Sequence, residues 1–197
     1  MERRDVMKML ATMPLGAWAM SAGDVADAAV HTHTVLDEIA QQPGKAFTPK
    51  FFSPLEWRTV RVLADIVIPR DAKSGSASDA GVPEFMDYVM IEFPNNQTRV
   101  REGLGWINAE SRSRFGVAFP DATAAQRVQI VDDIAFPSKN KPEHIQGVRF
   151  FSTFRDLTAS GFFTSRIGVS DIGYLGNRPQ SAWHGCSPAA EKKLGVS

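Results

Sequence analysis

The residues best suited to chemistry form two small clusters, one near each end of a chain of 197 residues. The C-terminal cluster, His184-Gly185-Cys186, brings an imidazole close to the only cysteine of the sequence. A thiol nucleophile needs a histidine within hydrogen-bond reach and a third group that orients the ring, which residues separated by one glycine rarely achieve. We therefore expect Cys186 to be a packed thiol or a contact to another chain, and catalysis by His184 and Cys186 is the alternative.

The N-terminal cluster is a pair of histidines within residues 31–33 (His-Thr-His). On an extended chain, side chains two residues apart point the same way and could share a metal ion. The neighbouring sequence lacks helical periodicity and contains Gln-Gln-Pro-Gly at residues 41–44, which is typical of a linker. We therefore expect both histidines to be solvated, and we predict no metal site.

Two further patterns resemble functional motifs without matching them. Asp132 and Asp133 fall in an expected helix, where neighbouring side chains diverge by about 100° and do not converge on one proton. Residues 103–105 (Gly-Leu-Gly) lack the third glycine and the preceding strand of a dinucleotide-binding fingerprint. We expect surface charges at the first and close helix packing at the second, so the sequence predicts no catalytic or cofactor-binding residue.

The charge balance argues against a polyanionic partner. Twenty-two Lys and Arg residues offset 22 Asp and Glu residues. A chain without net charge has no long-range field that would hold it on nucleic acid. A nucleic-acid partner is therefore not expected.

The first residues have the layout of an export signal. Arg3 and Arg4 open a charged segment that ends at Lys8, and an uncharged run follows over residues 9–22. This run is shorter than the ~20 apolar residues that span a bilayer, and the arginine pair matches the twin-arginine pattern. Small-x-small sequences at 17–19 and 26–28 place the mature start between residues 20 and 29. We expect a periplasmic protein; the alternative is a basic N-terminus before a buried helix.

The remaining chain carries five helical patterns and no convincing alternating strand. Capping boxes, Ser-Pro-Leu-Glu and Thr-Ala-Ala-Gln, begin the first and fourth of these helices, and Gly116 ends the third. We predict an all-α fold, a single compact helical domain of about five helices with a long irregular C-terminal segment. The expected helices span 53–67, 83–93, 97–115, 123–136 and 142–161. The expected domain organisation is a signal region at 1–29, a linker at 30–48 and the helical domain at 49–197.

The irregular segment, residues 162–187, is rich in Gly, Asn, Pro and Ser, and Tyr174 and Trp183 lie within it. A stretch of this length without periodicity suggests that it lies on another surface, its own core or that of a partner. Three Phe-Phe pairs, at 51–52, 150–151 and 162–163, also favour binding, because on a helix one ring of a pair can face outward. An aromatic-rich core is the alternative.

Four stretches in this order and spacing carry a resemblance to a known family. They are Phe-Phe-Ser-Pro-Leu-Glu-Trp to Ile-Pro at 51–69, Ala-Gly-Val-Pro-Glu-Phe-Met-Asp at 80–87, Gly-Leu-Gly-Trp-Ile at 103–107, and the region 150–186 with Gly-Phe-Phe-Thr-Ser, Asp-Ile-Gly-Tyr-Leu-Gly-Asn and Trp-His-Gly-Cys. The chain resembles the gluconate 2-dehydrogenase subunit 3 family over about residues 50–187.

The resemblance implies a non-catalytic small subunit of a periplasmic dehydrogenase complex. Its partners would be a flavoprotein large subunit of the glucose-methanol-choline type, which holds FAD, a c-type cytochrome, which holds haem c, and the twin-arginine translocase. The chain itself has no C-x-x-C-H haem site. A helical adaptor for an unrelated exported protein and a stand-alone periplasmic enzyme are the alternatives. The residues expected to contact the large subunit are Phe162, Phe163, Tyr174, Asn177, Trp183 and Cys186.

Overall fold

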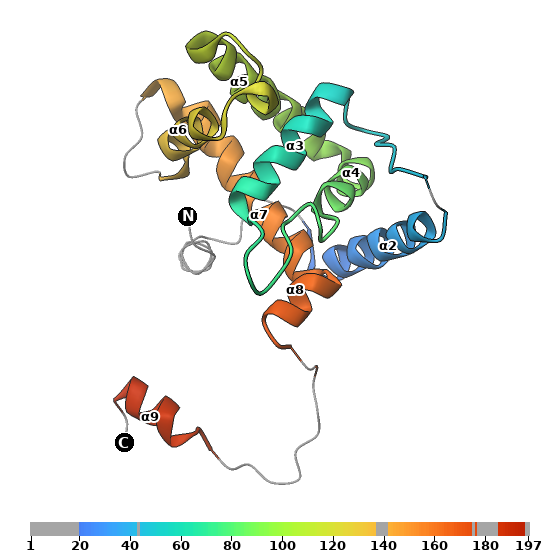
Figure 1. Cartoon of the computed structure of the whole chain (residues 1–197), viewed down its shortest axis with the longest axis vertical. Helices are drawn as coiled ribbons and strands as arrows, with labels where there is room; N and C mark the ends of the chain where they lie inside the picture. The colour runs from blue at the N-terminus through green and yellow to red at the C-terminus, as the bar shows by residue number, and fades with distance from the viewer. Residues whose placement is uncertain (1–19, 43, 137–141, 175, 177–184, 196–197) are drawn as a thin grey trace.

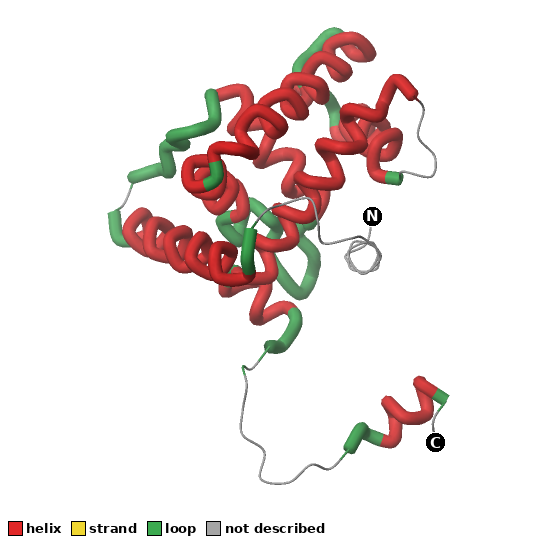
Figure 2. The backbone as a smooth tube through the Cα atoms, turned by 180° about the vertical axis from the view of Figure 1, so that it is seen from behind, coloured by secondary structure: helices red, strands yellow, loops and turns green. Residues whose placement is uncertain are grey.

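The computed structural model describes residues 20–42, 44–136, 142–174, 176 and 185–195. Its regular structure is helical throughout, with no strand among these residues, which confirms the predicted all-α fold (Figures 1 and 2). No helix in the described part of the chain is long and apolar enough to cross a membrane. The α-helices are α2 (Ala22–Ala40), α3 (Pro54–Val67), α4 (Val82–Glu92), α5 (Gln97–Phe115), α6 (Ala124–Ala135), α7 (Ile145–Thr164), α8 (Arg166–Asp171) and α9 (Pro188–Leu194), with short 3-10 turns at Pro94–Asn96, Phe119–Asp121 and Pro142–His144.

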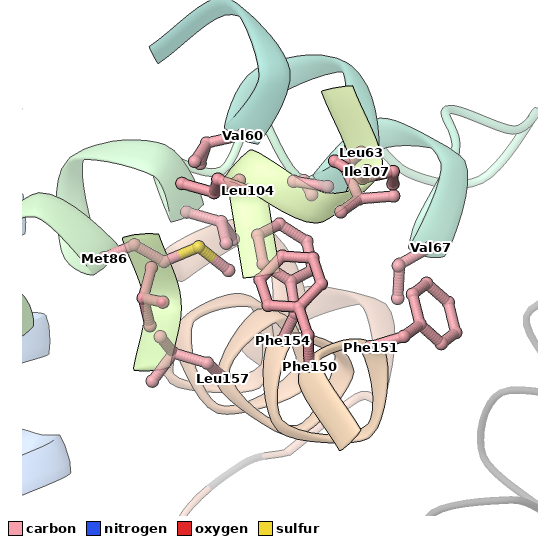
Figure 3. Close-up of a cluster of buried hydrophobic side chains, with 14 of the residues drawn as sticks. Val60, Leu63, Val67, Met86, Leu104, Ile107, Phe150, Phe151, Phe154 and Leu157 are labelled. Atoms are coloured by element: carbon pink, nitrogen blue, oxygen red, sulfur yellow. The ribbon is translucent and has the colours of Figure 1, made fainter. Parts of the chain in front are cut away.

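Helix α7 runs through the centre of the molecule and contacts helices α2 to α6 and α8 (Figure 1). A helix in this position must be apolar on most of its circumference. Figure 3 shows Phe150 and Phe154 pointing from α7 toward α5, while Leu157 lies near Met86 of α4. These side chains, together with Phe151, are almost completely buried. The cluster is the main core of the molecule.

The two capping boxes and Gly116 act as the sequence predicts. At α3, the Ser53 hydroxyl accepts from the Glu56 backbone N–H, and the Glu56 carboxylate accepts from the Ser53 N–H. Thr123 and Gln126 form the same reciprocal cap at α6. Helix α5 ends at Gly116, whose φ of 75° lies in the left-handed region that glycine tolerates best.

Helices α5 and α7 approach closely because each presents a glycine to an aromatic ring of the other. The Phe150 ring lies over Gly103, and the Trp106 ring lies over Gly147. This confirms the predicted packing role of Gly103. The prediction was wrong for Gly105, which is exposed and faces open space.

The expected linker is largely a helix. Helix α2 begins at a capping box between Ser21 and Asp24 and packs on α4 and α7. The residues it buries are Ala28, Ala29 and Thr32, which are too small or too polar to produce a visible apolar period. The linker prediction was therefore wrong for residues 30–40.

The end of α7 and the start of the irregular segment also differ from expectation. The helix continues past Gly161 to Thr164, because the absent side chain at Gly161 makes room for the Phe85 ring rather than ending the helix. Helix α8 follows at once, capped by Ser165. The irregular segment therefore begins near Ile172 and not at residue 162.

Candidate partner-binding surface

The Phe-Phe pairs mostly supply the core. Both rings of the first two pairs are buried, and Phe162 is fully buried and packs edge-to-face with Phe163 at a centroid distance of 5.2 Å. We therefore assign Phe162 to the core rather than to a partner contact. Phe163 is half-buried and packs against the same core. For these pairs, the structure therefore supports the alternative prediction, an aromatic-rich core.

Apolar side chains become exposed where α8 ends. Gly173, with a φ of 66°, turns the chain out of the helix, and the Tyr174 N–H donates to the Val169 carbonyl at 3.1 Å. The side chains on either side of this turn are half-exposed, Ile172 at 50% and Tyr174 at 56%. Large apolar groups at this exposure are candidates for contact with another surface.

Helix α8 is tied to the helical body at both ends. Arg166 forms a two-point ion pair with Asp37 of α2, at 2.7 and 2.8 Å. At the other end, the Lys73 ammonium contacts the carboxylate and the carbonyl oxygen of Asp171. The Arg166–Asp37 pair is solvent-exposed and contributes little to stability, whereas the Asp171 side chain at the other end is largely buried. Together the two contacts connect α8 to α2 and to the loop before α4.

The last helix stands apart from the others (Figures 1 and 2). Helix α9 is capped by the Ser187 hydroxyl and by Gly195, yet it buries none of its residues. Cys186, just before it, is exposed and forms no disulfide within the chain. Of the other predicted site residues, Arg3, Arg4, Asn177 and Trp183 lie outside the described residues.

A groove of about 510 Å³ lies between α2, α4 and residues 45–50. The His31 ring stacks on Tyr88 at a centroid distance of 4.0 Å and forms part of its lining. Glu84 of α4 also lines the groove; its Oε2 is buried and has no hydrogen-bond partner in the described part of the chain. Burial raises the pKa of the Glu84 carboxyl, and the nearby charge of Asp87 acts in the same direction.

Asp87 holds one wall of this groove in place. Its buried carboxylate accepts three successive backbone N–H groups, from Lys50 at 2.8 Å, Phe51 at 3.0 Å and Phe52 at 3.1 Å. Arg101 of α5 donates to the Phe51 carbonyl and lies over the Phe51 ring. The chain before α3 is thus fixed by charge-assisted bonds, which are stronger than neutral ones.

Sequence reasoning missed both Glu84 and Asp87. A signal was present, because α4 contains three acidic residues and no Lys or Arg. Acids without basic neighbours at i±3 or i±4 are either exposed to solvent, as Glu92 is, or placed against groups from other elements. Identifying the partners required the tertiary structure.

The residues first considered for chemistry do not come together. His31 and His33 lie two positions apart on α2, so they face different directions; His33 lies near Arg166, and burial together with that charge lowers its pKa. Asp133 forms an ion pair with Arg114 at 2.6 Å. Within the described ranges there is no group of three or more His, Cys, Asp or Glu side chains that could hold a metal ion.

The fold and this surface define a small all-α protein with exposed apolar groups at its C-terminal end and an acidic groove on one side. The family model of gluconate 2-dehydrogenase subunit 3 matches residues 54–182, which is more than half of the chain. The chain belongs to this family, whose members are accessory subunits of a dehydrogenase complex. Comparisons with curated proteins and with solved structures give no match.

Proposed function

We propose that this chain binds the flavoprotein large subunit of a gluconate 2-dehydrogenase-like complex, supports its folding and carries it to the periplasm. The family match over residues 54–182 is the observation that carries the proposal. Two features support it: the twin-arginine pattern at Arg3 and Arg4, and the exposed apolar side chains beyond α8.

In this proposal the redox groups belong to other subunits. The glucose-methanol-choline-type flavoprotein holds FAD and oxidises a sugar or sugar acid, and a c-type cytochrome holds the haem c that accepts the electrons. This chain binds no cofactor and contributes surfaces. The complex works in the periplasm, on the periplasmic face of the inner membrane through its partners.

The C-terminal segment, residues 172–195, is the part that we expect to dock on the large subunit. A helix as short as α9, with no buried residue, is marginal in water and gains stability by packing on a partner. Tyr174 and Trp183 are the kind of aromatic anchors that dominate binding energy at interfaces. Phe163, Asn177 and Cys186 complete the proposed contact.

Export of the partner tests the proposal. The chain is co-expressed with its flavoprotein subunit, and the double variant Arg3→Lys/Arg4→Lys is compared with Lys8→Arg, which leaves the arginine pair intact. We expect the double variant to retain the flavoprotein in the cytoplasm and the control to export it normally. Normal periplasmic levels of flavoprotein with the double variant would refute the escort function.

A further inference from the structure

The groove between α2 and α4 has the walls of a site for an aliphatic chain. Its sides carry Val35 and Ile39 from α2 and Ile91 from α4, and Ile91 is exposed. Phe47 adds an aromatic face from the connecting segment. Apolar walls of this kind favour the methylene stem of a long side chain or ligand.

The same groove concentrates negative charge on a chain that is neutral as a whole. Four carboxylates line it, against two lysines. The Asp87 carboxylate already accepts three backbone N–H groups, whereas Glu84 has a buried oxygen without a hydrogen-bond partner in the described part of the chain. Leaving a buried carboxylate oxygen without a donor costs folding free energy, so a ligand that supplies the donor is favoured. The charged lining residues are Glu38, Glu84, Asp87, Glu92, Lys45 and Lys50.

From these two properties we infer that the groove receives the side chain of an arginine or lysine from the partner subunit. The stem would lie along the apolar walls. The guanidinium or ammonium group would donate to the Glu84 carboxylate, whose Oε2 is closed to solvent in the free chain and would be uncovered by rotation of the side chain. The Tyr88 and Phe47 rings would add cation–π attraction. The identity of the donor rests on the proposed function, but the affinity of the groove for an organic cation does not.

The binding test uses the full chain without its partner. Nα-acetyl-L-arginine N-methylamide is titrated into isotope-labelled protein, and backbone amide shifts are followed by NMR. We expect saturable shifts at residues lining the groove, such as Ile39, Glu84 and Tyr88, and about tenfold weaker binding for Glu84→Gln. The matched control Glu102→Gln removes an exposed acid of α5 and should bind like the wild type. The citrulline analogue, which is uncharged, should give no saturable shift.

Three results would overturn the inference: no saturable shift with the arginine probe, equal binding of the citrulline probe, or unchanged binding by Glu84→Gln. Amide shifts remote from the groove report that the variant is folded. Agmatine is a free cation of the same chemistry and distinguishes a partner side chain from a small-molecule ligand. If agmatine binds more than about tenfold tighter than the arginine probe, the groove is a small-molecule site and the inference of a partner side chain is refuted. Because no flavoprotein is present, failure here would leave the export test unaffected.

Discussion

Gly103 of α5 and Phe150 of α7 are in such close contact that a Cβ atom added at Gly103 would lie 2.0 Å from the Phe150 Cδ2. The ring occupies the space that any other residue at position 103 would need. The reciprocal contact between Gly147 and Trp106, where the corresponding distance is 2.4 Å, repeats the arrangement farther along the same pair of helices. The position of the central helix thus depends on two residues that have no side chain.

We expect Gly103→Ala to destabilise the protein by ~1–3 kcal/mol or more, because overpacking forces the Phe150 ring or the α7 backbone to move. Gly105→Ala is the matched control, two residues away on the same helix but facing open space. There, alanine should stabilise the helix by up to ~1 kcal/mol. Chemical unfolding measures both, and equal effects would contradict the packing described above.

Asp87→Ala should be strongly destabilising, because it leaves three backbone N–H groups without their acceptor. Each buried unsatisfied group costs ~1–3 kcal/mol, less where water can enter. Asp87→Asn retains an acceptor oxygen and should lose less. Asp132→Ala, at an exposed position of α6, serves as the control with little expected effect. A loss for Asp87→Ala no larger than for Asp132→Ala would show that the three bonds are unimportant.

The stability of the isolated chain should depend on pH through Glu84. Burial raises its folded-state pKa above the ordinary value of 4.5, and the charge of Asp87 adds to this; a hydrogen bond from the Glu84 backbone and the charge of Arg61 oppose the rise only in part. The folded state therefore binds the proton more tightly, and this stabilisation is lost as the pH rises through the folded-state pKa. We expect Glu84→Gln to be more stable than the wild type at pH 7.

Thermal unfolding at a series of pH values checks this expectation, with Glu102→Gln as the control. The advantage of Glu84→Gln should vanish below about pH 4.5, where the wild-type carboxyl is protonated in both states. A variant that is less stable at neutral pH would mean that the backbone hydrogen bond and Arg61 outweigh the cost of burying the carboxylate.

The start of the mature chain can also be predicted. Cleavage after Ala28 would remove the Ser21 cap and the first turns of α2, although Ala28 is fully buried and Met20 packs against the core. If the leader is processed as we propose, we expect cleavage after Ala19, so that Met20 becomes the first residue. The intact mass of the periplasmic chain measures this, and a chain beginning at Ala29 would contradict it.

Sequence reasoning worked where a local signal determines the structure. Helix α5 was predicted from its start at Gln97 to its stop at Gly116 because its apolar positions and its C-terminal glycine are local signals. It failed for α2, whose buried face is made of alanine and threonine, and for Gly161, where the Phe85 ring from another helix explains the glycine. Glu84 and Asp87 escaped notice for the same reason, since their surroundings come from α2 and the segment before α3.

Two predicted contact residues, Tyr174 and Cys186, are exposed, and the irregular composition around them allowed this to be anticipated. The burial of Phe162 could not be anticipated, because adjacent phenylalanines look alike in sequence. Which of the two rings, Phe162 or Phe163, enters the core depends on where α7 ends and how its last turn packs.

Co-purification from the periplasm tests the central claim most directly. The tagged chain is co-expressed with its flavoprotein subunit, and flavin absorbance is measured in the eluted complex, alongside a variant that ends after Asp171. We predict that flavin co-elutes with the full chain and falls at least about tenfold with the shortened one, while the helical content of the body is retained. A flavoprotein that is folded, exported and never retained by the full chain would contradict the account.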